Sequence, residues 1–255
     1  RFTFAVGNGG SLQLGSEADV SGHVAAQNMV QLASGAKIRG DACSSYVGIA
    51  PLASIAGSQG ISGNCGEFSN AGHSDFSQLT NDIMQANLDA QVLVGLNIGS
   101  IEDSSLLNAA VNSVYHVNNL VLTAGEFLTI AGSAADSVVI NIAGDASIGS
   151  LAGIQLTGGI HASNVLFNLL DTVPVSNFEF GGAEISGTFL ANKRSFQLGD
   201  GAKLENVRFY NNSSMQANVQ VVHNPSHVEV PEPSTVLLML AGVFFLLIRA
   251  NSKHS

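Results

Sequence analysis

Short runs of alternating apolar and polar residues, divided by small residues, recur along most of the chain. The clearest repeat joins residues 14–22 and 32–40, in which Leu, Ser, Ala, a branched aliphatic residue and Gly return in the same order eighteen residues later. A third copy spans residues 198–206, and residues 183–191 before it parallel residues 18–26. The pattern therefore occurs near both ends of the domain.

An eighteen-residue repeat with small residues at its corners suits one coil of a β-solenoid, with three short faces of about six residues each. Side chains alternate inward and outward along such faces, so one aliphatic set should stack inside, coil upon coil. That set is Leu14, Val20, Val24, Leu32 and Ile38. We expect glycine at the corners, where a crowded or left-handed backbone excludes a Cβ atom: Gly22, Gly40 and Gly187. The alternative is an antiparallel meander with glycine turns.

Strands are also predicted in the middle of the chain, where aliphatic runs lie between turn residues. These runs are residues 120–122, 127–130, 138–142 and 165–169. Residues 103–114 are ambiguous, because they fit a short helix while residues 111–117 could equally open the next strand.

One long helix interrupts the strands. Apolar residues spaced by three and four predict an amphipathic helix near residues 75–91, with Ser74 or Asp75 as its N-cap. The apolar positions are Phe76, Leu79, Ile83, Ala86 and Ala90. We expect this stripe to pack along the side of the solenoid, and a cofactor or partner groove is the alternative.

The C-terminal residues have the order of a membrane-targeting segment. Pro231, Glu232 and Pro233 precede the uncharged run 236–248, and Arg249 and Lys253 follow it. Thirteen residues span only about 20 Å as a helix, short of the roughly 30 Å hydrocarbon core. The basic residues act as a membrane stop and favour a cytoplasmic C-terminus, which leaves residues 1–230 outside.

This segment resembles the PEP-CTERM sorting tail of Gram-negative bacteria. The resemblance implies an exosortase-type sorting protease as partner and a transient hold in the inner membrane. The family usually ends in a tight Arg cluster, whereas this chain has residues 249–253 with Arg249 and Lys253 apart. An ordinary single-pass anchor or a buried C-terminal core helix is the alternative.

Composition narrows the function classes further. Charged residues make up only 11% of the chain, and the net charge is −10, so nucleic acid would be repelled. Cys43 and Cys65 are the two cysteines, and in an exported protein they predict one disulfide that closes a long loop. A pair of unrelated small core residues is the alternative.

Residues 2–212 resemble the choice-of-anchor A family of bacterial surface proteins and, more distantly, ice-binding β-solenoids with a side helix. The stretches that carry the resemblance are residues 19–26, 138–144, 164–169 and 187–191. It implies a β-solenoid-like domain held at the cell surface by varied C-terminal anchors, without established catalysis. Residues 167–170 and 190–192 depart from the family's aromatic-Asn-Phe-Pro and Leu-Ala-Pro runs.

Candidate chemistry is sparse. The seven histidines are scattered, and no Cys/His cluster or Gly-x-Ser-x-Gly elbow is present, so we expect no metal, no cofactor and no enzyme. No Thr-x-Thr pair marks a water-ordering face in residues 1–230.

The sequence thus predicts a mainly β, β-solenoid-like domain at 1–222 with one long helix alongside. A linker at 223–230 and a sorting signal with a hydrophobic helix at 231–253 come after it. We expect an exported structural or adhesive protein of the cell surface or exopolysaccharide matrix, with exopolysaccharide or matrix proteins as possible partners. An ice-binding or glycan-binding module is the first alternative, and a surface hydrolase the second.

Overall fold

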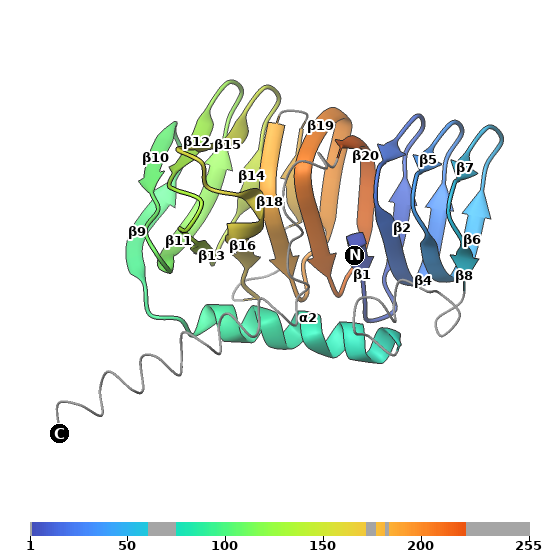
Figure 1. The fold of residues 1–255 in the computed structure, drawn as a ribbon, viewed down its shortest axis with the longest axis horizontal. Helices are drawn as coiled ribbons and strands as arrows, with labels where there is room; N and C mark the ends of the chain where they lie inside the picture. The colour runs from blue at the N-terminus through green and yellow to red at the C-terminus, as the bar shows by residue number, and fades with distance from the viewer. Residues whose placement is uncertain (1, 61–74, 172–176, 182–183, 223–255) are drawn as a thin grey trace.

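The structure is a computed structural model that describes residues 2–60, 75–171, 177–181 and 184–222. These residues form a β-solenoid with one long helix, α2 (Phe76–Gln91), along its side (Figure 1). All the strand pairings in the described residues are parallel. The predicted solenoid is therefore confirmed, and the antiparallel meander is wrong.

The coils have three faces. Face A, which carries α2, pairs its strands in the order β9 (Leu96–Ile101), β11 (Ser113–Leu122), β13 (Val138–Ile142), β16 (Val165–Leu169), β18 (Glu184–Ala191), β19 (Phe196–Asn211), β1 (Phe2–Val6), β4 (His23–Leu32), β6 (Ala42–Ile49) and β8 (Gln59–Gly60). Face B runs β11, β14 (Ala146–Ile148), β17 (Phe178–Phe180), β19, β20 (Met215–Val222), β2 (Ser11–Leu14), β4 and β6. The longer strands bend at a corner and so belong to two faces.

Face C begins with a separate three-stranded sheet and continues into the main one. Its strands are β10 (Ser105–Asn108), β12 (Phe127–Ala131) and β15 (Gly153–Thr157), then β18, β19, β20, β3 (Asp19–Val20), β5 (Lys37–Ile38) and β7 (Ser54–Ile55). A short 3-10 helix, η1 (Ala162–Asn164), precedes β16.

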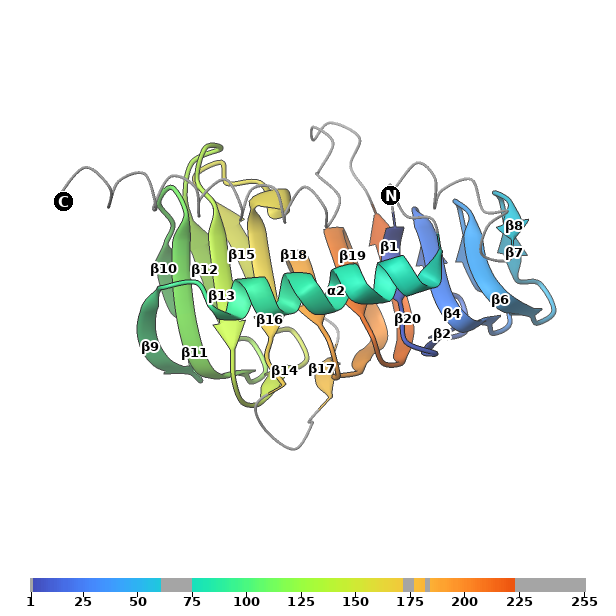
Figure 2. The same cartoon turned by 90° about the horizontal axis from the view of Figure 1, so that it is seen from below.

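The chain does not wind from one end of the solenoid to the other. Residues 2–60 wind from the middle toward one end, and α2 then runs back along face A (Figures 1 and 2). Residues 96–222 wind from the opposite end back to the middle, where β19 pairs with β1 and β20 pairs with β2 and β3. The first and last described coils are therefore neighbours.

The sequence repeat corresponds to this stacking. Leu14 pairs with Leu32 and Val20 pairs with Ile38, as the eighteen-residue period requires. Leu198 and Leu14 lie far apart in the chain, but both pair with Ala217 and so stand in one row. All five side chains expected inside are buried. A Cβ atom at Gly40 would lie 2.8 Å from the backbone of Gly22, and Gly187 has a φ of +124°, as expected for corners.

Phenylalanines fill the core of the middle coils. The rings of Phe167, Phe189 and Phe209 stack in sequence with centroid distances of 4.7 and 4.9 Å. Phe178 and Phe196 pack against this stack at an angle. Because buried aromatic rings contribute large apolar areas, this stack supplies much of the apolar packing of the middle coils.

The long helix lies where the sequence predicts it. Asp75 is the N-cap, and its side chain accepts a hydrogen bond of 2.9 Å from the Gln78 backbone N–H. All five predicted apolar positions are buried, and α2 crosses β13, β16, β18 and β19 of face A (Figure 2). The second helix considered for residues 103–114 is wrong. Those residues form β10 and the start of β11, whose neighbours β12 and β13 supply strand partners.

Several predicted features lie outside the described residues. These are Cys65, the linker at 223–230 and the segment 231–253, with Pro231, Glu232, Pro233, Arg249 and Lys253. Cys43 is buried on β6 and disulfide-bonded, while its pairing with Cys65 stays a prediction. Within the described ranges, no helix has the length and apolar character needed to cross a membrane.

Candidate binding face

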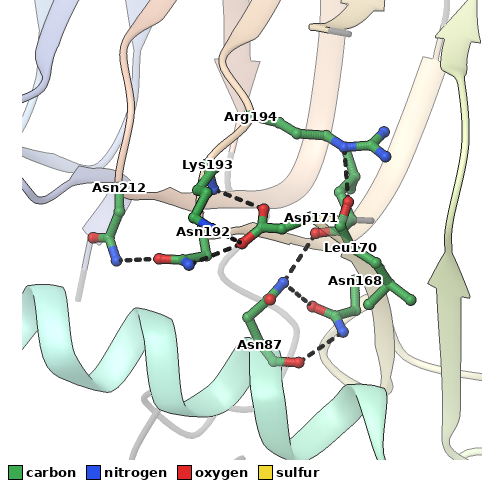
Figure 3. Close-up of polar contacts among 9 residues, drawn as sticks. Asn87, Asn168, Leu170, Asp171, Asn192, Lys193, Arg194 and Asn212 are labelled. Atoms are coloured by element: carbon green, nitrogen blue, oxygen red, sulfur yellow. Dashed lines mark hydrogen bonds and ion pairs between the residues drawn. The ribbon is translucent and has the colours of Figure 1, made fainter. Parts of the chain in front are cut away.

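Face A is closed by α2 through buried amide groups. The Asn87 side chain donates to Asn168 Oδ1 at 2.7 Å, and Asn168 donates to the Asn87 backbone carbonyl at 3.1 Å (Figure 3). Asn168 also donates to Asn141 Oδ1 at 2.8 Å, and Asn141 donates to the Ala90 carbonyl at 2.7 Å. All three asparagines are buried, so each bond replaces one that water made in the unfolded chain.

A buried arginine fixes the corner beside this network. Arg194 is only 1% exposed and donates to the carbonyls of Leu170, Ala143 and Gly144 at 3.0, 3.0 and 2.6 Å. Burial lowers the pKa of the Arg194 guanidinium, and the carboxylate of Asp171 opposes that shift. Three carbonyl partners thus hold a cation whose desolvation is costly.

The neighbouring residues tie this corner to the helix. The Asp171 carboxylate accepts from the Asn192 side chain at 2.9 Å and from the Lys193 backbone N–H at 3.1 Å (Figure 3). Asn212 donates to Asn192 Oδ1 at 3.0 Å and to the carbonyl of Thr80 on α2 at 2.9 Å. These hydrogen bonds therefore hold α2 at several points, and the part of face A beneath α2 is not an open surface.

Face B carries an exposed column of amides, and no helix of the described residues covers it. Gln197 pairs with Gln216, Gln216 with Gln13, and Gln13 with Gln31. All four glutamines are exposed, while the residues on either side of each along the strand are buried. Successive side chains in such a column lie about 4.8 Å apart, the spacing of paired strands. We name these four residues the glutamine column.

A groove continues the column toward β11. It has a volume of about 710 Å³ and includes Gln197 and Gln216. The other lining residues come from β11, β14, β17, β19 and the turns after them: Val121, Leu122, Thr123, Ala124, Ser147, Ile148, Gly149, Glu179, Phe180, Gly181, Leu198 and Gly199. The groove thus lies on the part of face B at β14 and β17 and does not reach β2 or β4.

Face C differs in charge. At the coils where face B has Gln13 and Gln31, face C presents Asp19 and Lys37. The Arg39 guanidinium donates through Nε to Asp19 at 2.8 Å, and this hydrogen bond raises the pKa of Arg39. Of the two faces that α2 does not cover, face B therefore presents uncharged side chains in these coils, whereas face C presents charged ones.

The described residues hold no group of three or more His, Cys, Asp or Glu arranged to bind a metal ion. Two of the histidines serve local structure, since His23 Nδ1 lies 3.0 Å from the Asp41 backbone nitrogen and His116 Nε2 lies 3.0 Å from the Leu93 carbonyl.

The glutamine column was not anticipated from the sequence, although a signal for it existed. Gln13, Gln31 and Gln197 each stand directly before the Leu that opens a copy of the repeat. Only the pairing with β20 adds Gln216, because Ala217 replaces Leu there.

Comparison with known proteins identifies the fold. No protein-family model matches the chain, and no curated protein matches it either. Solved structures are similar: an ice-binding protein from an Antarctic biological consortium aligns with a TM-score of 0.57 and 19% identity over 87% of this chain and 86% of that one. The ice-binding protein LeIBP from an Arctic yeast aligns with a TM-score of 0.54 and 15% identity, covering 91% and 93%.

A domain of ice-binding protein 1 from Shewanella frigidimarina gives a TM-score of 0.53 at 15% identity, covering 88% of this chain and 95% of that one. At these identities the likeness concerns the fold. The chain therefore has the β-solenoid fold with a side helix that these ice-binding proteins have.

Proposed function

We propose that this protein binds ice through face B. The observation that carries the proposal is the glutamine column, an exposed row of uncharged hydrogen-bonding groups in register on a face that α2 leaves open. The fold shared with solved ice-binding proteins supports ice as the ligand. It favours this alternative over the purely structural or adhesive role that the sequence leads us to expect.

The chemistry of the column suits an ordered water surface. A primary amide both donates and accepts, so each glutamine can bond to a water molecule in either orientation. The strand ladder holds the bases of these side chains at a fixed spacing of about 4.8 Å, which lowers the ordering cost when they meet a regular surface. The lack of Thr-x-Thr ranks means that amides, and not threonine hydroxyls, make these contacts.

The test compares two glutamines on one strand. Gln216 and Gln220 are both exposed on β20, but Gln216 lies on face B and Gln220 on face C. We expect thermal hysteresis from the protein, a strong loss in Gln216→Lys as in Gln13→Lys and Gln31→Lys, and no loss in Gln220→Lys. Equal activity in all the variants, or none in the parent protein, overturns the proposal.

We also propose that the protein is exported and displayed at the cell surface or in the extracellular matrix, as a choice-of-anchor A-like protein. The order of Pro231-Glu232-Pro233, an uncharged apolar run and Arg249 supports sorting by an exosortase-type protease after a transient stop in the inner membrane. Proline on both sides of Glu232 disfavours a helix in this sequence, which supports recognition of the backbone by a protease.

Replacing Glu232 with Ala should leave the full-length protein in the membrane fraction and deplete the outer surface. Processing identical to that of the parent would mean that the tail is a plain anchor.

A further inference from the structure

We infer that the groove on face B is a binding site for a neutral, linear polysaccharide. The inference goes beyond ice binding, because it concerns the groove alone. The groove contains Gln197 and Gln216, whereas Gln13 and Gln31 lie outside it.

The first reason is the direction of the groove. Ser147 pairs with Glu179, Glu179 with Gln197, and Gln197 with Gln216. All four line the groove, so hydrogen-bonding side chains follow one another across the strands at about one strand spacing. A ligand that uses them all must be extended and must present polar groups at regular intervals, as a linear polymer does.

The second reason is how the hollow is made. The positions after the paired residues Ile148, Phe180 and Leu198 are Gly149, Gly181 and Gly199, so three neighbouring coils lack a side chain at the same point. A Cβ atom at Gly199 would lie 2.9 Å from the Phe180 carbonyl oxygen, and one at Gly181 would lie 3.3 Å from the Ser150 backbone nitrogen, so both positions face the backbone of the neighbouring coil. All three glycines line the groove, so no side chain projects into it at these three positions beside the polar row.

The third reason is charge. The described lining residues include no Lys, Arg or His, and Glu179 is the one acidic residue among them. With a net charge of −10 on the chain, an anionic polymer finds no cation here and is repelled. Hydroxyls of a neutral sugar, by contrast, can both donate to the amide and carboxylate oxygens and accept from the amides.

A peptide fits less well than a glycan. An extended peptide is normally held by backbone hydrogen bonds to an open strand edge. In the groove, β14 pairs on both sides with β11 and β17, and β17 pairs on its other side with β19, so no such edge is offered. Two-carboxylate glycoside hydrolysis requires a pair of carboxylates, and Glu179 is the one carboxylate among the described lining residues, so we expect binding without cleavage.

The experiment is affinity electrophoresis of the full protein in native gels that contain hydroxyethyl cellulose, laminarin or dextran as neutral probes, with alginate as the anionic probe. At least one neutral polymer should retard the protein and alginate should not. Gln197→Ala and Gln216→Ala should each weaken the retarding affinity about fivefold, as expected for a lost hydrogen bond, and Gly181→Val should abolish it by filling the groove.

Gln13→Ala and Gln31→Ala are the matched controls, because they alter the same column outside the groove. Their retardation should equal that of the parent even if they lose ice binding, which separates failure of this inference from failure of the proposed function. The exposed glutamine variants keep the test valid if Gly181→Val does not fold. No retardation by any neutral probe, retardation by alginate alone, or equal retardation of the parent and the Gln197→Ala variant overturns the inference.

Discussion

Faces A and B each carry a row of side-chain amides in register, but they use them in opposite ways. On face A, Asn141 pairs with Asn168, and both are buried beneath α2 with their amide groups bonded to protein atoms. On face B, Gln13 pairs with Gln31, and both side chains face solvent.

The comparison separates the amides that stabilise the fold from those that are free to bind a ligand. A buried amide that loses its partner stays out of contact with water and makes no replacement hydrogen bond. An exposed amide that loses its partner bonds to water instead. Substitutions under α2 should therefore lower stability, and substitutions in the glutamine column should alter binding without doing so. Four variants test this contrast, taken in order of expected size.

The largest effect is expected for Arg194→Ala. It removes the guanidinium that donates to three carbonyls and leaves a cavity, so we expect the free energy of unfolding to fall by about 3–5 kcal/mol in urea titration. Arg194→Lys should recover only part, because an ammonium lacks the planar fork that reaches several acceptors. The neighbour Lys193 is exposed, and Lys193→Ala should change stability by no more than about 0.5 kcal/mol. Equal losses of stability in Arg194→Ala and Lys193→Ala would show that the buried guanidinium does not stabilise this corner of the coil.

Asn168→Ala comes next. Asn168 accepts from Asn87 and donates to Asn87 and Asn141, so its removal leaves buried groups without partners and should cost about 2–4 kcal/mol. The measurement is again urea unfolding, with Gln13→Ala as the exposed amide control. If the two variants lose the same stability, burial does not distinguish the two rows.

Thr80→Val should have a smaller effect. The Thr80 hydroxyl accepts from the Asn8 backbone N–H at 2.8 Å and joins α2 to the turn after β1. Valine keeps the shape and loses this bond, so we expect a loss of about 1 kcal/mol, seen as a lower urea midpoint at an unchanged slope. Thr80→Ser, which keeps the hydroxyl, is the control and should retain the bond. A changed slope would mean that the compactness of one state, and not one hydrogen bond, had changed.

The smallest effect on folding is expected for Gln31→Ala. The side chain is exposed, so the free energy of unfolding should stay within about 0.5 kcal/mol of the parent while thermal hysteresis falls. Gln220→Ala on face C should leave both quantities unchanged. Loss of stability in Gln31→Ala would place the glutamine column among the structural contacts.

Elements that recur at a fixed period could be predicted from the sequence. Leu14 and Leu32 stand one coil apart in both sequence and space, and the spacing from Phe76 to Ala90 predicted α2 and its buried side. The middle coils could not be aligned in this way. The stacked residues Ile148 and Phe180 are separated by a longer stretch of chain than Phe180 and Leu198, so no fixed period connects them.

The candidate site depends on this missing alignment. A groove made of Gly149, Gly181 and Gly199 exists only once the unequal coils are stacked, and nothing local marks those glycines as neighbours. The sequence-based site residues Pro231, Glu232 and Pro233 belong to the proposed sorting signal, and they lie outside the residues that the structure describes.

The meeting of β1 with β19 in the middle of the solenoid has a consequence for the timing of folding. Phe4 pairs with Phe209, so β1 cannot form this pairing until a partner just over two hundred residues later has been synthesised. Contacts so distant in sequence are slow to form, because the loop between them must close before any contact rewards it. Until then β1 pairs on one side only, with β4, and its other edge is open. The coil that contains β19 closes that edge, so the domain has no complete middle until its last residues are in place.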